Sequence, residues 1–206
     1  MKEFWNERYS SEEYVYGKEP NVFFQQEIEK LIPGNALFVA EGEGRNAVYA
    51  AEKGWDVYAF DISEQGREKA LNLAAEKQVS IDYSIASVLD IELKGASFDL
   101  VVFVFTHFPE AIRDDAFMHV LKSIKPGGHV IFECFSKEHL NYNAHNNSGG
   151  PRDETMLYSE SMVRELFKDF QKILLEKKIV VLNEGRFHDG EGSVIRYVGK
   201  RLSIDN

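Results

Sequence analysis

The sequence predicts an α/β protein, a three-layer sandwich with helices on both faces of a mostly parallel, seven-stranded sheet. The first observation behind this is the alternation of apolar runs and amphipathic segments between residues 36 and 134. Second, these runs are apolar throughout, as in parallel strands covered on both faces. Third, two β patterns near the C-terminus have no helix between them, which predicts an antiparallel pair.

The individual elements follow from periodicity and turn residues. Pro20 opens a helical pattern that Pro33-Gly34 stops, and Pro126-Gly127-Gly128 marks a turn before the fifth strand. A polar stretch over 137–157 is expected to be a long connection, and 184–192 the last turn. We expect helices over 21–31, 46–53, 65–77, 114–124 and 159–170, and strands over 36–40, 55–61, 81–86, 98–105, 129–134, 172–183 and 193–200.

A chain of 206 residues is expected to fold as one domain. Within it we expect an N-terminal lid and helix over 1–34, a cofactor-binding half over 35–136, and a substrate loop with the strand pair over 137–206. The aromatic segment over 4–20 should form a short helix and an irregular stretch. Its aromatic side chains either close over a cofactor or plug the edge of the core, and a lid is favoured for Tyr16-Gly17.

The composition is that of a soluble globular protein and restricts its partners. A formal net charge of -10 argues against non-specific binding to nucleic acid or to an anionic membrane. The single cysteine, Cys134, fits a reducing compartment, and we expect a cytoplasmic protein. Histidines and acids show no metal-ligand spacing, so no metal site is expected.

The most informative stretch runs from Ala36 into Glu41-Gly-Glu-Gly-Arg45. A buried strand ends there in a glycine turn and passes directly into a helix. Glycine accepts unusual backbone angles and places no Cβ in the way of a ligand. A helix N-terminus offers free N–H groups, so the stretch predicts a cradle for a nucleotide-like cofactor. The alternative is a tight turn followed by an ordinary helix cap.

Asp61 ends the next predicted strand and follows Gly42 by about twenty residues, the interval at which a carboxylate grips a ribose diol. It alternatively caps the helix that starts near Ser63. The carboxyl ends of parallel strands meet at one edge of a sheet. The glycine turn and Asp61 should therefore border one crevice, together with residues 87–90, 106–107 and 135–136.

These motifs resemble those of class I S-adenosylmethionine (SAM)-dependent methyltransferases, and especially the small bacterial group similar to tellurite-resistance methyltransferases. The matching pieces are Glu41–Ala47, Phe60-Asp61, Ser97–Leu100, Leu121–Gly128, Gly149-Gly-Pro151 and Glu184-Gly-Arg-Phe-His188. The resemblance implies a Rossmann-like fold with SAM as cofactor. It also implies a small acceptor, such as a thiol or a tellurite- or selenite-like oxyanion. The sequence leaves open whether the protein is a monomer or a homodimer.

The resemblance further implies which residues bind SAM. The turn after the first strand would line the methionine part of SAM, and Asp61 would hold the ribose hydroxyls. The loop after the third strand would surround the adenine, and the end of the fourth strand would lie near the sulfonium. The cofactor-binding residues so implied are Ala40, Glu41, Gly42, Glu43, Gly44, Arg45, Asp61, Ile62, Ser87, Val88, Leu89, Phe105 and Thr106.

The chain departs from the family pattern at three positions. Phe38 and Ala40 stand where the family commonly has an acid and a glycine, and Ser87 stands where it has an acid. Whether other acids replace the missing ones is open at this point. Glu41 and Glu43 are candidates to replace the acid that is missing at Phe38. Asp90 is the candidate to replace the acid that is missing at Ser87.

Methyl transfer to a good nucleophile needs little acid–base help, whereas a poor one needs a base. His107, beside the crevice, is the candidate base, and the alternative is a histidine that closes a turn. His188 and Arg186 either contact the substrate or are solvated turn residues. Tyr16 and Gly150 complete the candidate substrate residues.

Two other functions stay open. The pattern Gly42-x-Gly44-x-x-Ala47 also satisfies the fingerprint of an NAD(P)-dependent oxidoreductase. The unusual residues Phe38, Ala40 and Ser87 are compatible with a non-catalytic SAM-binding protein.

Overall fold

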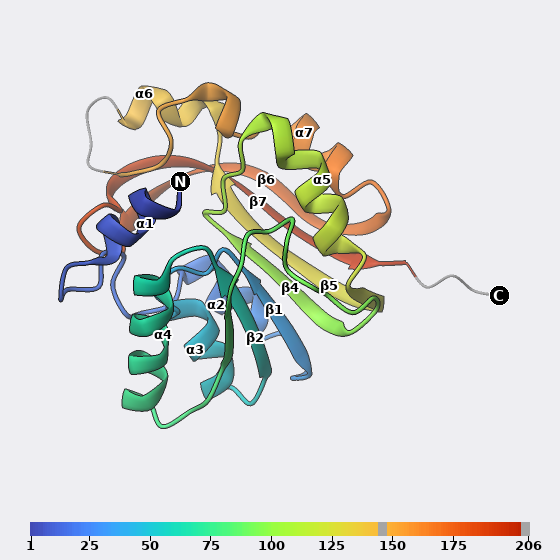
Figure 1. Cartoon of the computed structure of the whole chain (residues 1–206). Coiled ribbons are helices and arrows are strands. Elements are labelled where there is room, and N and C mark those ends of the chain that lie inside the picture. Colours follow the sequence, from blue (N-terminus) through green and yellow to red (C-terminus); the bar gives the residue numbers. More distant parts are fainter. Residues whose placement is uncertain (144–147, 203–206) are drawn as a thin grey trace.

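A computed structural model describes residues 1–143 and 148–202. Its centre is a seven-stranded sheet in the order β3-β2-β1-β4-β5-β7-β6, in which only the pairs that involve β7 are antiparallel (Figure 1). The strands are β1 Asn35–Val39, β2 Asp56–Asp61, β3 Asp82–Ile85, β4 Phe98–Val104, β5 Ile124–Phe135, β6 Phe170–Asn183 and β7 Asp189–Arg201. The predicted fold class is confirmed.

Helices cover both faces of this sheet (Figure 1). The α-helices are α1 Lys2–Tyr9, α2 Val22–Ile28, α3 Arg45–Glu52, α4 Glu64–Glu76, α5 Glu110–Leu121, α6 Leu140–Asn143 and α7 Glu160–Leu166. Two short 3-10 helices are η1 Lys137–His139 and η2 Glu154–Met156. None of the helices in the described part of the chain combines the length and the apolar character that a membrane crossing requires.

The apolar core has two halves, one on each face of the sheet. On one face Phe24 of α2 and Ala47 of α3 pack against Phe38 of β1. On the other face Phe117 of α5 packs on Phe103 of β4, with ring centroids 4.7 Å apart, and α7 adds Val163. Strands buried on both faces explain the continuous apolar runs in the sequence.

Several boundaries differ from those that the sequence predicts. Helix α5 starts at Glu110, and β5 runs over Ile124–Phe135, so the Pro-Gly-Gly turn lies inside a strand. A register shift between Phe98 and Leu100 lets β4 and β5 pair on both sides of that turn. The final turn is shorter than expected because β7 begins at Asp189. The connection over 137–157 contains short helices, and its residues 144–147 lie outside the described chain.

Candidate active site at the carboxyl ends of the strands

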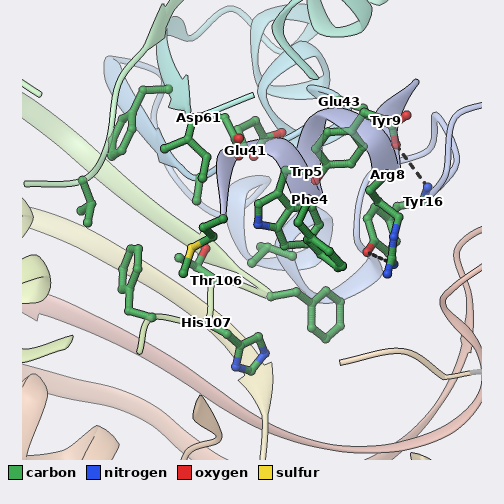
Figure 2. A pocket seen from close by; sticks show the side chains of 18 of the residues that line it. Phe4, Trp5, Arg8, Tyr9, Tyr16, Glu41, Glu43, Asp61, Thr106 and His107 are labelled. Atoms are coloured by element: carbon green, nitrogen blue, oxygen red, sulfur yellow. Dashed lines mark hydrogen bonds between the residues drawn. The ribbon is translucent and has the colours of Figure 1, made fainter. Parts of the chain in front are cut away.

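A cavity of about 840 Å³ opens at the carboxyl ends of the parallel strands. The exits of β1, β2, β3 and β4 form its floor, and helix α1 and the turn between β6 and β7 add walls. Figure 2 shows Asp61 and Glu41 on one side of this cavity and Thr106 and His107 on another, with Trp5 and Phe4 projecting between them. The expected crevice is therefore present.

The two glycines of the turn after β1 serve packing inside the protein. Gly42 and Gly44 have φ angles of 63° and 87°, which favour glycine. A Cβ at Gly42 would lie 2.5 Å from Tyr9 Oη, and one at Gly44 would lie 2.5 Å from Ala70 Cβ. Neither glycine lines the cavity. They let α1 and α4 approach the turn, rather than clearing space for a ligand as the sequence suggested.

Glu41 lines the cavity and holds the first turn of α3. Its Oε1 accepts hydrogen bonds from the backbone N–H groups of Asn46 at 2.9 Å and Ala47 at 2.8 Å. Burial raises the pKa of Glu41 to about 7, although these N–H groups and Arg45 favour the ionised form. The preceding residue, Ala40, has a φ of 51°, in the conformation that the glycine expected here would adopt readily.

Glu43 has a different task, because its carboxylate is almost fully buried beneath the N-terminal segment. It accepts hydrogen bonds from Val15 N at 2.9 Å and Tyr16 N at 3.3 Å. Lys69 of α4 completes the set with an ion pair, Nζ to Oε1 2.6 Å. With its oxygens committed to these groups, Glu43 anchors the segment that carries Tyr16.

Asp61 is buried at the end of β2 and ties two turns together. Its Oδ2 accepts a hydrogen bond from Gly42 N at 3.1 Å, and its Oδ1 accepts one from Ser63 N at 2.9 Å. Ser63, rather than Asp61, caps α4. Burial raises the pKa of Asp61 to about 6, against the lowering effect of these N–H donors. A carboxylate with remaining lone pairs in a cavity can accept hydrogen bonds from ligand hydroxyls.

Helix α1 closes one side of the cavity with aromatic side chains. Trp5 stacks on Tyr9 with ring centroids 5.4 Å apart, and Phe4 packs edge-on against Trp5 at 5.3 Å. Arg8 donates a hydrogen bond to Tyr16 Oη at 3.3 Å, which joins the helix to the segment that Glu43 anchors (Figure 2). The N-terminal aromatics thus lie over the strand ends.

His107 is enclosed between backbone groups. Its Nδ1 lies 2.9 Å from the carbonyl oxygen of Met156, and its Nε2 lies 3.4 Å from Phe135 N. Burial lowers its pKa to about 3, so the ring is neutral, with Nδ1 donating and Nε2 accepting. The alternative that the sequence left open, a histidine closing a turn, describes this arrangement.

His188 projects from the turn between β6 and β7 into the same cavity. Its ring lies 4.4 Å from Phe105 and 4.6 Å from Tyr16, measured between centroids. Its Nδ1 lies 3.2 Å from Glu184 Oε2, and burial lowers the pKa of the imidazole. It is therefore buried, and not the solvated turn residue of the alternative interpretation.

Glu184 is fixed by a buried polar network. Arg45 Nη2 donates to Oε2 at 2.9 Å, and Asn21 Nδ2 donates to Oε1 at 3.0 Å. Burial alone would raise the pKa of Glu184, but Arg45 and His188 hold it at about 2. Asn21 also donates to Glu133, a buried carboxylate that pairs with Arg196.

Comparison with known proteins finds a family match that runs from β1 into β5. Residues 36–128 match the family described as "Methyltransferase domain". The chain therefore carries a methyltransferase domain over these residues. That match and the antiparallel β7 between β5 and β6 decide against the dinucleotide oxidoreductase alternative.

Solved structures share the fold at low sequence identity. A protein from work on "Conversion of a Disulfide Bond into a Thioacetal Group during Echinomycin Biosynthesis" is 16% identical, with a TM-score of 0.79 over 100% of this chain and 94% of its own. TehB from Haemophilus influenzae is 14% identical, with a TM-score of 0.70 over 97% of this chain and 66% of its own. NodS from Bradyrhizobium japonicum, in complex with S-adenosylhomocysteine (SAH), is 13% identical, with a TM-score of 0.70 over 98% of both chains.

A curated relative is similar in sequence over part of its length. The tRNA (uracil(54)-C(5))-methyltransferase of Pyrococcus abyssi is 28% identical over 144 residues. The match takes in 65% of this chain and 34% of that protein, so the chain spans about a third of the relative's length.

The cavity brings together most of the residues that the sequence singled out. Residues from both the cofactor set and the substrate set line it: Ala40, Glu41, Glu43, Arg45, Asp61, Ile62, Ser87, Val88, Phe105, Thr106, His107, Tyr16, Gly150 and His188. Four others lie outside its lining, namely Gly42, Gly44, Leu89 and Arg186. Leu89 is exposed, and Arg186 borders a separate hollow beside α1. Asp90 also lies outside the lining and accepts a hydrogen bond from Ser87 Oγ at 2.6 Å.

Sequence reasoning missed part of the wall. Phe4 and Arg8 come from α1, Phe108 from the loop before α5, Ile112 from the first turn of α5, and Met156 from η2. The aromatic segment over 4–20 pointed to the region of Phe4 and Arg8. Nothing in the local sequence distinguishes Phe108, Ile112 and Met156 from core residues. Among the described residues no group of three or more His, Cys, Asp or Glu side chains could hold a metal ion. Cys134 is fully buried, and burial raises its pKa well above the usual range.

Proposed function

We propose that the chain transfers the methyl group of SAM to the thiol, or a similar soft nucleophile, of a small and largely apolar molecule. The observation that carries this proposal is the Glu184–His188 pair, whose imidazole lines an aromatic cavity. When bound, SAM supplies a methyl group on a sulfonium, which a nucleophile attacks in line.

We assign the cofactor to the carboxylate side of the cavity. Asp61 would accept hydrogen bonds from the ribose hydroxyls, with Ile62, Ser87 and Val88 beside the adenine. Glu41 would meet the amino group, because Glu43 is committed to Val15, Tyr16 and Lys69. These residues fit an adenosyl amino acid, because carboxylates can accept hydrogen bonds from its ribose hydroxyls and from its ammonium group. Unchanged SAM affinity in a calorimetric titration of Glu41→Ala would contradict the assignment of Glu41.

The charge state of Glu184 fixes the tautomer of His188. A carboxyl group with a pKa of about 2 is ionised at neutral pH and can only accept hydrogen bonds. His188 Nδ1 therefore donates to it, and the neutral ring keeps its lone pair on Nε2. A thiol in the cavity can transfer its proton to Nε2 as its sulfur attacks.

His107 does not suit this task, because both of its ring nitrogens are bonded to backbone groups. A base must have a free lone pair within reach of the proton that it removes. His107 is better explained as a support, since it joins the loop that carries Met156 to the end of β5.

The cations at the cavity favour a neutral acceptor over a tellurite- or selenite-like oxyanion. Arg45 is paired with Glu184, and Lys2 with Glu64 at 2.7 Å. Arg8 bonds Tyr16 and lies over the ring of Phe187, with its guanidinium carbon 4.1 Å from the centroid. Each of these cations already has a partner, whereas an apolar thiol packs against Phe105 and Phe135 without competing for it.

The decisive experiment measures SAH release from SAM with a panel of apolar thiols, tellurite, selenite and tRNA. With a thiol of ordinary pKa, His188→Gln should lower kcat by roughly 10²–10⁴-fold, the usual contribution of a general base. The loss should shrink with an acidic thiol that is already ionised. His107→Gln is the matched control and should leave the pH profile unchanged.

Other outcomes have distinct meanings. Turnover with tellurite or selenite but no thiol would overturn the choice of acceptor. Methylation of tRNA would instead extend the activity named for the Pyrococcus relative to this chain. SAM binding without turnover on the whole panel would support the non-catalytic alternative.

A further inference from the structure

Strand β6 is an unusually long open edge. It has 14 residues, whereas β3 at the opposite edge of the sheet has 4. Within the described chain β6 pairs with β7 alone and bounds the sheet on that side (Figure 1). Unpaired N–H and C=O groups along an edge accept another strand, and proteins commonly shorten or cover such edges.

The exposed side chains of β6 are apolar at both ends. Ile173, Ile179 and Val181 have exposed fractions of 56%, 56% and 77%. The charged residues Glu176, Lys177 and Lys178 occupy the middle of the strand. Exposed Ile and Val on an open edge strand favour pairing with a further strand, and charges in the middle restrict which register is allowed.

We propose that β6 pairs antiparallel with β6 of a second copy of this chain, so that the two sheets join into one across a two-fold axis at Lys177. In this register Glu176 lies opposite Lys178 of the second copy, and by symmetry the contact occurs twice. Leu175 lies opposite Ile179, also twice. The same register brings Ile173, at the bulge near one end, beside Val181.

This register fits better than its neighbours. With the axis at Glu176, two Glu176 side chains would face each other with no cation opposite. With the axis between Lys177 and Lys178, two lysine pairs would face each other, and directly opposed like charges destabilise a sheet. At the proposed axis Lys177 meets its own copy, but its charge is balanced by Glu138, at 2.6 Å from Nζ in the same chain. Glu176 has a long ion pair in its own chain, 3.9 Å from Oε1 to Arg196 Nη1, and Lys178 of the second copy would add a second cation.

Sedimentation velocity over a wide range of concentration tests the pairing. The wild-type chain should reach a dimer, and Lys178→Glu or Glu176→Lys should weaken it by about tenfold or more, since each reverses two cross-strand contacts. The double variant Glu176→Lys/Lys178→Glu restores opposite charges at both contacts and should recover the wild-type dissociation constant. A wild-type monomer at every concentration, or no recovery in the double variant, overturns the proposal.

Cross-linking gives an independent measurement in a chain whose native thiol is buried. Lys177→Cys places two thiols at the axis, within reach of a short bismaleimide, because opposed Cα atoms in antiparallel strands are about 4.5–5.5 Å apart. The control is Asp82→Cys on the exposed side of β3. A covalent dimer of the Lys177→Cys variant, with none of the Asp82→Cys variant, supports the pairing. Equal cross-linking of both variants, or none, contradicts it.

Discussion

The guanidinium of Arg45 and the carboxylate of Glu184 form a buried ion pair, 2.9 Å from Nη2 to Oε2, with side-chain exposures of 8% and 10%. The pair joins the first residue of α3 to the turn between β6 and β7. It thus links the start of α3, directly after the glycine turn, with the turn that carries His188.

Glu184→Gln should destabilise the protein strongly, because it leaves the charge of Arg45 buried without a counter-charge. We expect a loss of about 3–5 kcal/mol in the free energy of unfolding, measured by urea denaturation. Glu165→Gln removes the partner of Lys168 in a pair that is 73% and 64% exposed, and is the matched control. It should leave the free energy of unfolding nearly unchanged, because water screens an exposed pair. Equal losses in the two variants would contradict a special role for the buried pair.

SAH binding should depend on pH through Asp61. The raised pKa of about 6 means that the carboxyl is protonated below that pH and then accepts hydrogen bonds from hydroxyls poorly. Affinity measured by calorimetry should fall as pH drops from 7 to 5, by up to roughly tenfold per unit below the pKa. Asp61→Asn should bind weakly at every pH.

Glu41 also titrates in this range, with a pKa of about 7, so Glu41→Gln separates the two contributions. If Asp61→Asn keeps the full pH dependence and Glu41→Gln loses it, the titrating group is Glu41 and the role given to Asp61 is wrong.

Ala40→Gly should leave the fold unchanged or make it more stable. An L-residue in the left-handed conformation costs about 1–2 kcal/mol, and glycine adopts it freely. Glycine also loses more conformational entropy on folding, and this offsets about 0.5–1 kcal/mol of the gain in stability. Thermal denaturation should therefore show an equal or higher Tm. Ala47→Gly, inside α3, should by contrast lose about 1 kcal/mol.

Glu43→Gln should loosen the N-terminal wall of the cavity. The substitution weakens the acceptor of Val15 N and Tyr16 N and leaves Lys69 without its counter-charge. Hydrogen exchange at these two amides should accelerate, and SAH binding should weaken. Glu12→Gln, at an exposed residue of the same segment, should change neither. Unchanged exchange in Glu43→Gln would show that α1 holds the segment alone.

The sheet and the crevice at its carboxyl edge were predictable because their signals are local. A buried strand, a glycine turn and the acid of Asp61 about twenty residues later follow from topology that many sequences share. The glycines nevertheless serve packing against Tyr9 and Ala70, a role that no spacing distinguishes from ligand clearance.

The remaining features depend on contacts between distant segments. Arg45 and Glu184 are far apart in the sequence, and no periodicity relates them. The length of β5 was missed because Pro126-Gly127-Gly128 is typical of a turn, whereas a register shift accommodates it within the strand. Trp5 and Tyr9 could equally have completed the core, because a short aromatic helix does not indicate which surface it covers.

Met1 and Lys2 are exposed residues in the lining of the cavity, which has a practical consequence for recombinant work. An affinity tag fused ahead of Met1 would start beside this cavity. Preparations that retain such a tag should be compared with cleaved protein before any affinity is interpreted, since vector-derived residues can fold back into the cavity.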